Sequence, residues 1–327
     1  MAHTANPLPG GPGPFGFWRK AAAVGVVVCL IVSLAVAARL IAVSGARQYR
    51  SLRGIINDGG TCSLSARTSL GLKFRDLGIF DRSFSWRLGI PAAAFFVPAR
   101  SVQLYKSCTN ADLERVGRLP WLTKLFILRS QVTDRGMSVV ARLRRLKSLA
   151  ILEVNITGAG LRGLSNLRGL QKLYLNKTGA DDDIFGIIAP LDDLRLLSLA
   201  GDERVTGKRA EGISKLARLQ YLALDGTHFS DAGLRWVGML HDLRYLTLED
   251  DNNITNSGLR MLTGRVKLRT LNLSGTQITN RAFRWIADMP SLRVLSLDRT
   301  HCTLHGIANL RRARPLLQVR HASLRLR

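Results

Sequence analysis

One short pattern recurs along most of the chain and restricts the folds available to it. In LNLSGTQITNRAFRWI, residues 271–286, leucines alternate as in a strand, turn and cap residues follow, and apolar residues then recur with helical spacing. The same pattern begins at eight positions, here called the marker leucines: Leu125, Leu149, Leu173, Leu197, Leu222, Leu246, Leu271 and Leu295. Successive marker leucines are 24 or 25 residues apart. Such a regular period indicates a stack of repeated strand–turn–helix units.

Each unit is expected to bury one side of its strand. Leu271 and Leu273 are two residues apart and point to one face, while Asn272 points to the other. Thr279 or Asn280 is placed to N-cap the helical turn that follows. One unit cannot enclose its own apolar side, so neighbours about 4.8 Å apart must stack and bury it together. The sequence therefore predicts a curved α/β solenoid, with a parallel sheet on its concave side and short helices on its convex side.

The spacing resembles the leucine-rich repeat, L-x-x-L-x-L-x-x-(N/C)-x-L, whose positions are filled here by Leu268, Leu271, Leu273, Thr276 and Ile278. Threonine mostly replaces the usual Asn or Cys, at Thr178, Thr227, Thr276 and Thr300. This departure resembles the T-x-(I/V)-T-D-x-G-L repeats of bacterial proteins with an N-terminal membrane anchor, and is similar to repeats of F-box ubiquitin-ligase receptors. The resemblance covers residues 101–319. It implies a horseshoe solenoid, and it specifies the fold much better than the function.

The residues before the repeats predict a membrane anchor. Residues 1–20 are rich in Pro and Gly and are expected to be disordered, whereas residues 21–43 are almost uncharged and are expected to form one transmembrane helix. The alternatives are a signal peptide cleaved near Ala35-Val36-Ala37 and a buried soluble helix. Residues 44–100 are expected to form a juxtamembrane helix and an N-terminal cap of the solenoid, and residues 320–327 a basic tail. The chain is thus expected to be a single-pass membrane protein, and the side of the membrane that holds the repeats stays open.

The charge balance favours anionic partners. Lys and Arg total 48 against 23 Asp and Glu, which gives a net charge of +25. Four arginines fall at the same phase of successive convex helices: Arg162, Arg235, Arg260 and Arg284. This convex arginine stripe is either a solvated face or a contact surface for an acidic partner or a lipid surface. No nucleic-acid-reading motif accompanies the charge, so nucleic acid is not an expected partner.

The concave face is the expected partner-binding surface. Residues one before, one after and three after a marker leucine point away from the core. The notable ones are Phe126, Leu128, Leu152, Tyr174, Tyr221 and Tyr245, followed by the acidic Asp225, Glu249 and Asp298. Exposed aromatic and apolar side chains of this kind are typical of protein-binding sites. The alternative is that they are ordinary half-exposed strand residues.

No motif points to catalysis. His301, Cys302 and His305 lie close in sequence, but Cys302 occupies an inward position while His301 faces a loop, so we expect no metal site and no cofactor. No nucleophile lies in register with a general base, so no enzymatic activity and no small-molecule substrate are expected. The predicted function is that of a membrane-anchored scaffold for protein–protein interaction. The alternatives are an F-box-like adaptor in ubiquitin-dependent degradation, by repeat similarity alone, and binding of an anionic lipid or acidic ligand by the convex arginine stripe.

Overall fold

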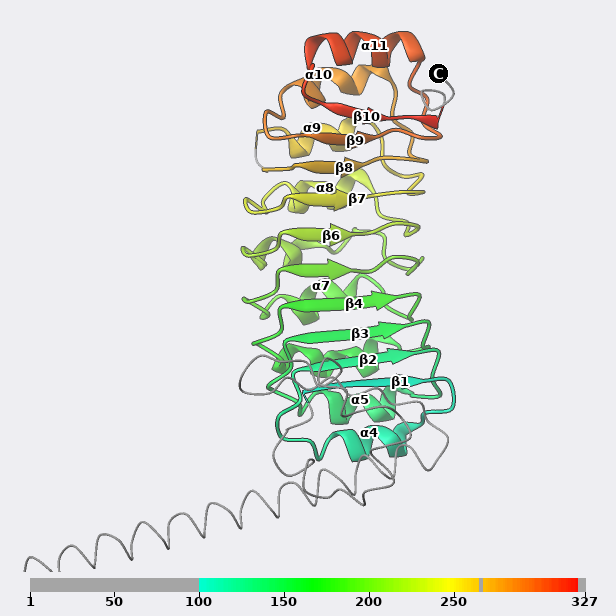
Figure 1. Ribbon diagram of the computed structural model, residues 1–327, viewed down its shortest axis with the longest axis vertical. Coiled ribbons are helices and arrows are strands. Elements are labelled where there is room, and N and C mark those ends of the chain that lie inside the picture. Colours follow the sequence, from blue (N-terminus) through cyan, green and yellow to red (C-terminus); the bar gives the residue numbers. More distant parts are fainter. Residues whose placement is uncertain (1–99, 265–266, 323–327) are drawn as a thin grey trace, which may run out of the picture.

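The computed structural model describes residues 100–264 and 267–322. In this part the chain forms one ten-stranded sheet, in which the strands follow one another in chain order (Figure 1). The strands are β1 Ser101–Tyr105, β2 Lys124–Leu128, β3 Ser148–Leu152, β4 Lys172–Asn176, β5 Leu196–Ser198, β6 Tyr221–Ala223, β7 Tyr245–Thr247, β8 Thr270–Asn272, β9 Val294–Ser296 and β10 Gln318–Arg320. The predicted solenoid is confirmed.

Short helices connect the strands and lie behind the sheet in the view of Figure 1. The α-helices are α4 Asn110–Val116, α5 Asp134–Val140, α6 Gly158–Leu161, α7 Asp183–Ile188, α8 Asp231–Val237, α9 Asn256–Leu262, α10 Phe283–Ala287 and α11 Leu304–Ala313. Three 3-10 turns accompany them: η2 Arg162–Asn166, η3 Glu211–Lys215 and η4 Asn280–Ala282. The solenoid therefore has two layers, a sheet on one side and helical turns on the other.

The marker leucines set the register of the sheet. Leu125 lies opposite Leu149, and Leu271 lies opposite Leu295, in parallel pairings. Val102 lies opposite Leu125 and Val319 opposite Leu295, so these valines continue the stack by one strand at each end. Because equivalent positions stack on one another, a side chain that faces the core in one repeat faces it in all of them.

The core lies between the sheet and the helical layer as one continuous cluster of apolar side chains. Leu271 and Leu273 are both fully buried, whereas Asn272 between them is partly exposed. The alternation predicted for the strands is therefore confirmed. A single repeat would leave these leucines in water, and the hydrophobic effect of burying them holds the stack together.

A polar latch joins several pairs of neighbouring repeats on the side of the convex helices. The Asp231 carboxylate accepts hydrogen bonds from the N–H of Thr255, at 2.8 Å, and from its hydroxyl. The same latch joins Asn110 to Thr133, Asp134 to Thr157, Asp182 to Thr206, Asn256 to Thr279 and Asn280 to Thr303. The predicted N-cap role of Thr279 is confirmed, since its hydroxyl accepts from the N–H of Arg281 at 3.3 Å. In each latch the Asp or Asn side chain of one repeat therefore binds the threonine of the next.

A second row of polar residues is buried five positions after the marker leucines. Thr227 and Thr276 occupy this position as expected, but Asp202 and Asp251 also occupy it and are only 2% and 0% exposed. Thr178 donates its N–H to Asp202 at 2.6 Å, and the Thr227 hydroxyl donates to Asp251 at 2.8 Å. Burial outweighs these bonds and raises the pKa of Asp202 to about 7 and that of Asp251 to about 8. Both carboxyls are therefore stabilised in their protonated form.

The predicted N-terminal segments 1–20, 21–43 and 44–100 lie outside the described residues except for Arg100, as do residues 323–327 of the basic tail. In residues 100–264 and 267–322, no helix has both the length and the apolar character needed to cross a membrane.

Candidate partner-binding surface

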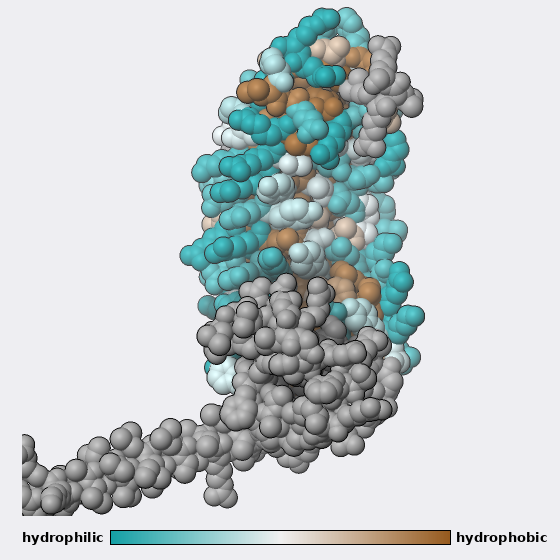
Figure 2. Space-filling view, in the orientation of Figure 1, coloured by the Kyte–Doolittle hydropathy of each residue, from teal (hydrophilic) through white to brown (hydrophobic). Residues whose placement is uncertain are grey.

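The residues predicted to face a partner lie on one side of the sheet. Phe126, Leu128, Leu152, Tyr174, Tyr221 and Tyr245 belong to strands, and Asp225, Glu249 and Asp298 lie two residues past the ends of β6, β7 and β9. All are partly exposed, and Tyr245 is the most open of the tyrosines at 41%. Figure 2 views the molecule in the orientation of Figure 1 and shows hydrophilic residues along both sides, with a paler to brown band between them. The face thus has an apolar middle and two polar edges.

The aromatic residues of this face form two separate pairs. The rings of Tyr221 and Tyr245 have centroids 6.0 Å apart and planes inclined by 31°, and those of Tyr105 and Phe126 are 5.8 Å apart and inclined by 56°. Tyr174 belongs to neither pair, because the register places it level with Ser198 of β5 and not with Tyr221. Aromatic pairs at these distances are stabilised by their electrostatics as well as by burial.

Tyr105 was not predicted, because its strand lacks a marker leucine. Its position three residues after Val102 is equivalent to that of Leu128 after Leu125, which is the signal that could have identified it. The structure adds it to the candidate surface.

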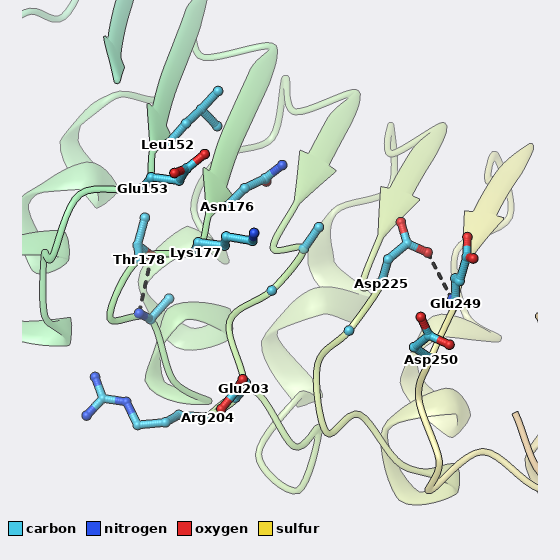
Figure 3. A pocket seen from close by; sticks show the side chains of 14 residues that line it. Leu152, Glu153, Asn176, Lys177, Thr178, Glu203, Arg204, Asp225, Glu249 and Asp250 are labelled. Carbon is cyan, nitrogen blue, oxygen red and sulfur yellow. Dashed lines mark hydrogen bonds between the residues drawn. The ribbon is translucent and has the colours of Figure 1, made fainter. Parts of the chain in front are cut away.

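The predicted acidic residues are engaged in bonds between repeats. Asp225 accepts from the Thr247 hydroxyl at 2.7 Å. It also accepts from the N–H of Glu249 at 2.9 Å (Figure 3). Glu249 in turn accepts from Arg299 at 2.9 Å and from Asn272 at 3.0 Å. Burial raises the pKa of Asp225 above its usual range. These carboxylates therefore link neighbouring repeats and give the acidic side of the face a fixed shape.

The backbone turns through the left-handed region four residues after each marker leucine and its equivalent Val102. Glycine supplies this conformation at Gly201, Gly226 and Gly275. The other repeats use charged residues with φ between 44° and 62°: Lys106, Arg129, Glu153, Lys177, Asp250 and Arg299. Such residues are uncommon in this region, where each costs about 1–2 kcal/mol.

Ion pairs connect several of these left-handed residues. Arg129 binds Glu153 of the next repeat through two nitrogens, at 2.7 and 3.0 Å. Arg299 binds Glu249 at 2.9 Å and Asp250 at 2.8 Å, two repeats away. The intervening repeat has Gly275 at the equivalent position, so no side chain separates Arg299 from Asp250.

An open groove of about 890 Å³ lies at this edge of the sheet (Figure 3). It forms where Ala200, Gly201 and Gly226 place small residues in two successive repeats. Lys177 and Asp250 also line the groove, on either side of the glycines, so its walls carry both positive and negative charge. The signal in the sequence is the pair of glycines at the turn position of adjacent repeats.

The convex arginine stripe lies on the helical layer, away from the aromatic pairs. Arg162 begins η2, and Arg235, Arg260 and Arg284 belong to α8, α9 and α10; all four are exposed. Arg235 and Arg284 are stacked over neighbouring tryptophans, with Cζ 4.5 Å and 4.2 Å from the ring centroids. The two predicted surfaces occupy different layers of the solenoid, so each can be altered without touching the other.

Several solved structures are similar to this chain, and one family model matches it. Internalin C2 of Listeria monocytogenes is 22% identical with a TM-score of 0.45, over 66% of this chain and 84% of that one. Internalin F of the same organism is 17% identical with a TM-score of 0.39, over 71% and 91%, and a TDR receptor is 18% identical with a TM-score of 0.47, over 67% and 37%. No curated protein matches the chain. The model of the family described as leucine-rich repeat region matches residues 100–314, and the chain belongs to this family.

Proposed function

We propose that this protein is a membrane-anchored, non-catalytic scaffold that binds a protein partner on the concave face of its solenoid. The observation that carries the proposal is the pair of Tyr221 and Tyr245, which stack at 6.0 Å on the exposed side of the sheet. Neither ring is needed to fill the core, because the marker leucines of the same strands are fully buried behind them. Tyrosines in this setting are typical of the residues that dominate binding energy at interfaces.

The sheet itself supports a role in binding. Equivalent positions stack about 4.8 Å apart, so Tyr174, Tyr221 and Tyr245 fall within roughly 15 Å along the solenoid, which is well inside a standard interface. The bonds of Asp225 and Glu249 fix the neighbouring polar side chains before a partner arrives. A preformed surface loses less entropy on binding than a flexible one.

The test begins with proximity labelling in the native cell, with the repeat domain as bait. For the partner so identified, Tyr221→Ala with Tyr245→Ala is expected to weaken binding by at least about 2 kcal/mol, roughly thirtyfold in Kd. Met239→Ala with Met261→Ala is the control, since these side chains are 40% and 45% exposed outside the concave face. If the tyrosine pair is silent, or if the two pairs have equal effects, the concave face is not the binding surface.

The anchor rests on the sequence of residues 21–43, which is the longest apolar run in the chain. Removal of residues 1–45 is expected to release a folded, soluble repeat domain, measured by membrane fractionation and circular dichroism. If the full chain is found in the soluble fraction with its N-terminus uncleaved, the anchor does not exist.

A further inference from the structure

A row of basic side chains runs along the edge where the chain enters the concave sheet. Seven of the eight marker leucines have a basic residue at one of the two positions before them, Leu222 being the exception, and none of the eight has an acidic residue there. We name this row the basic edge, and its members are Lys124, Lys147, Lys172, Arg195, Arg244, Arg269 and Arg293. All are exposed except Arg244, which is partly exposed. The basic edge was not predicted, although the recurring L-R-x-L of the later repeats is its signal in the sequence.

The acidic residues nearest in sequence to the basic edge pair with other cations, since Asp193 binds Arg218 and Asp242 binds Lys267. In the described part of the chain, none of its members forms an ion pair with another residue. Arginines that do form ion pairs, such as Arg129 and Arg299, lie elsewhere. Arg293 donates to the carbonyl oxygens of Pro290 and Leu292, and these bonds leave its positive charge uncompensated. The basic edge therefore presents net positive charge to solvent.

The acids of the same face are too far away to cancel this charge. Asp225 and Glu249 lie four positions beyond Tyr221 and Tyr245, which begin their strands, a separation of about 13 Å at the rise of an extended chain. The Debye length at physiological ionic strength is about 8 Å, so the two edges act on a partner independently. Charge on the concave face is thus divided across the width of the sheet.

The dimensions of the basic edge suit an extended polypeptide. It reaches from β2 to β9, about 34 Å at the spacing of neighbouring strands, which is the length of roughly ten extended residues. Arg244 directly precedes Tyr245, which lies opposite Tyr221, so the tyrosine pair offers apolar contact next to the row. A wide polyanion such as a nucleic-acid duplex would also cover Asp225 and Glu249 and be repelled there, whereas a single extended chain fits on the basic half alone.

We propose that the basic edge binds an acidic, extended segment of the partner protein. This inference rests on the proposed function, because it gives the chemistry of the partner of the same concave face. The acidic segment runs across the strands, with its carboxylates on the basic edge and an apolar side chain against the Tyr221–Tyr245 pair. Charge steers the segment to the face, and the tyrosines hold it there.

The probe is a fluorescent peptide of about twelve residues that alternates glutamate and serine around one central leucine. Its binding to the full chain in neutral detergent is measured by fluorescence anisotropy at low and at physiological salt. The test variant carries Arg244→Gln, Arg269→Gln and Arg293→Gln. The matched control carries Arg162→Gln, Arg260→Gln and Arg284→Gln, which remove the same charge from the convex face.

The basic-edge variant is expected to raise Kd by at least about tenfold, and the convex variant by less than about twofold. Equal losses from the two variants, or no loss from the basic-edge variant, would overturn the proposal. A single-stranded oligothymidylate of the same length is the second probe. If it binds more tightly than the peptide and loses as much from the basic-edge variant, the basic edge is a general polyanion site and the proposal of an acidic protein segment is wrong.

The native partner separates this proposal from the proposed function. If the partner's binding depends on Tyr221 and Tyr245 but is unchanged in the basic-edge variant, the proposed function stands and the proposal of an acidic segment is wrong. If neither set of substitutions weakens binding, the proposed function is wrong as well. A partner weakened by both supports the two together.

Discussion

The two edges of the concave sheet use charged residues in opposite ways. At the edge where strands end, here called the exit edge, Arg129 binds Glu153. Arg299 binds Glu249 and Asp250 at the same edge, so charges connect one repeat to another. At the edge where strands begin, here called the entry edge, the residues of the basic edge carry charges that have no such partners. The difference follows from the backbone at each place.

At the entry edge, backbone hydrogen bonds of the basic-edge residues connect successive repeats. The carbonyl oxygen of Arg244 accepts from the N–H groups of both Arg269 and Thr270, and that of Arg269 accepts from Arg293 and Val294. These bonds do not involve side chains, so the side chains are free to vary and to serve binding. Backbone bonds also connect repeats at the exit edge, as from the N–H of Arg129 to the carbonyl oxygen of Leu152. There, however, the chain must turn through a left-handed conformation, and side-chain bonds compensate for its cost.

The comparison depends first on the strand register, because both edges are defined by counting from buried leucines. Leu271→Ala removes a fully buried side chain stacked between Leu246 and Leu295, and is expected to cost about 2–5 kcal/mol of unfolding free energy. Asn272→Ala, on the exposed face, loses its hydrogen bond to Glu249 and the two that it accepts from Ser274, and is expected to cost about 1–2 kcal/mol. Urea unfolding measures both, and equal losses would show that the register is misassigned.

The next prediction concerns the acids buried beside the exit edge. Asp251 has a pKa of about 8 in the folded chain against an ordinary value of 3.8, chiefly because of burial. Between these values the folded chain holds a proton that the unfolded chain has released, so stability falls as pH rises from about 4 to about 8. Asp202, with a pKa of about 7, adds to the same trend. The carboxylate would be left charged in an apolar site at high pH.

Asp251→Asn removes this titration and keeps the acceptor for Thr227. The variant is expected to be more stable than the natural chain by about 1–3 kcal/mol at pH 8, and nearly equal to it at pH 5. Thermal unfolding at the two pH values measures the difference. An advantage that is the same at both pH values would mean that Asp251 does not hold a proton in the folded chain.

The smallest expected effect contrasts the two edges within one strand. Lys177→Gly at the exit edge relieves a positive φ of 52°, and is expected to stabilise the chain by about 0.5–1 kcal/mol. Lys172→Gly at the entry edge lies in the regular strand β4 and is expected to destabilise it by about the same amount. Opposite signs in urea unfolding would confirm the contrast, and a loss from both would show that the left-handed turn carries no strain.

Much of the candidate site could be predicted because its rules are local. The alternation around Leu271 and Asn272 gave the direction of each side chain, and the period placed Tyr221 and Tyr245 in adjacent repeats. The basic edge is equally visible in the sequence, as arginine two positions before successive marker leucines. Strand alternation alone does not predict it, because the position two before a buried leucine is expected to face the core.

The sequence by itself determined the repeat, the register and the face of each side chain, because these depend on spacings within one unit. Only the tertiary structure decided which side chains meet. Arg299 binds residues 49 and 50 positions earlier across Gly275, and the groove exists because two neighbouring repeats both lack a side chain at one position. The raised pKa of Asp251 likewise depends on how completely the stack buries it. Contacts between repeats join residues about one or two periods apart, and a local pattern does not specify their distances.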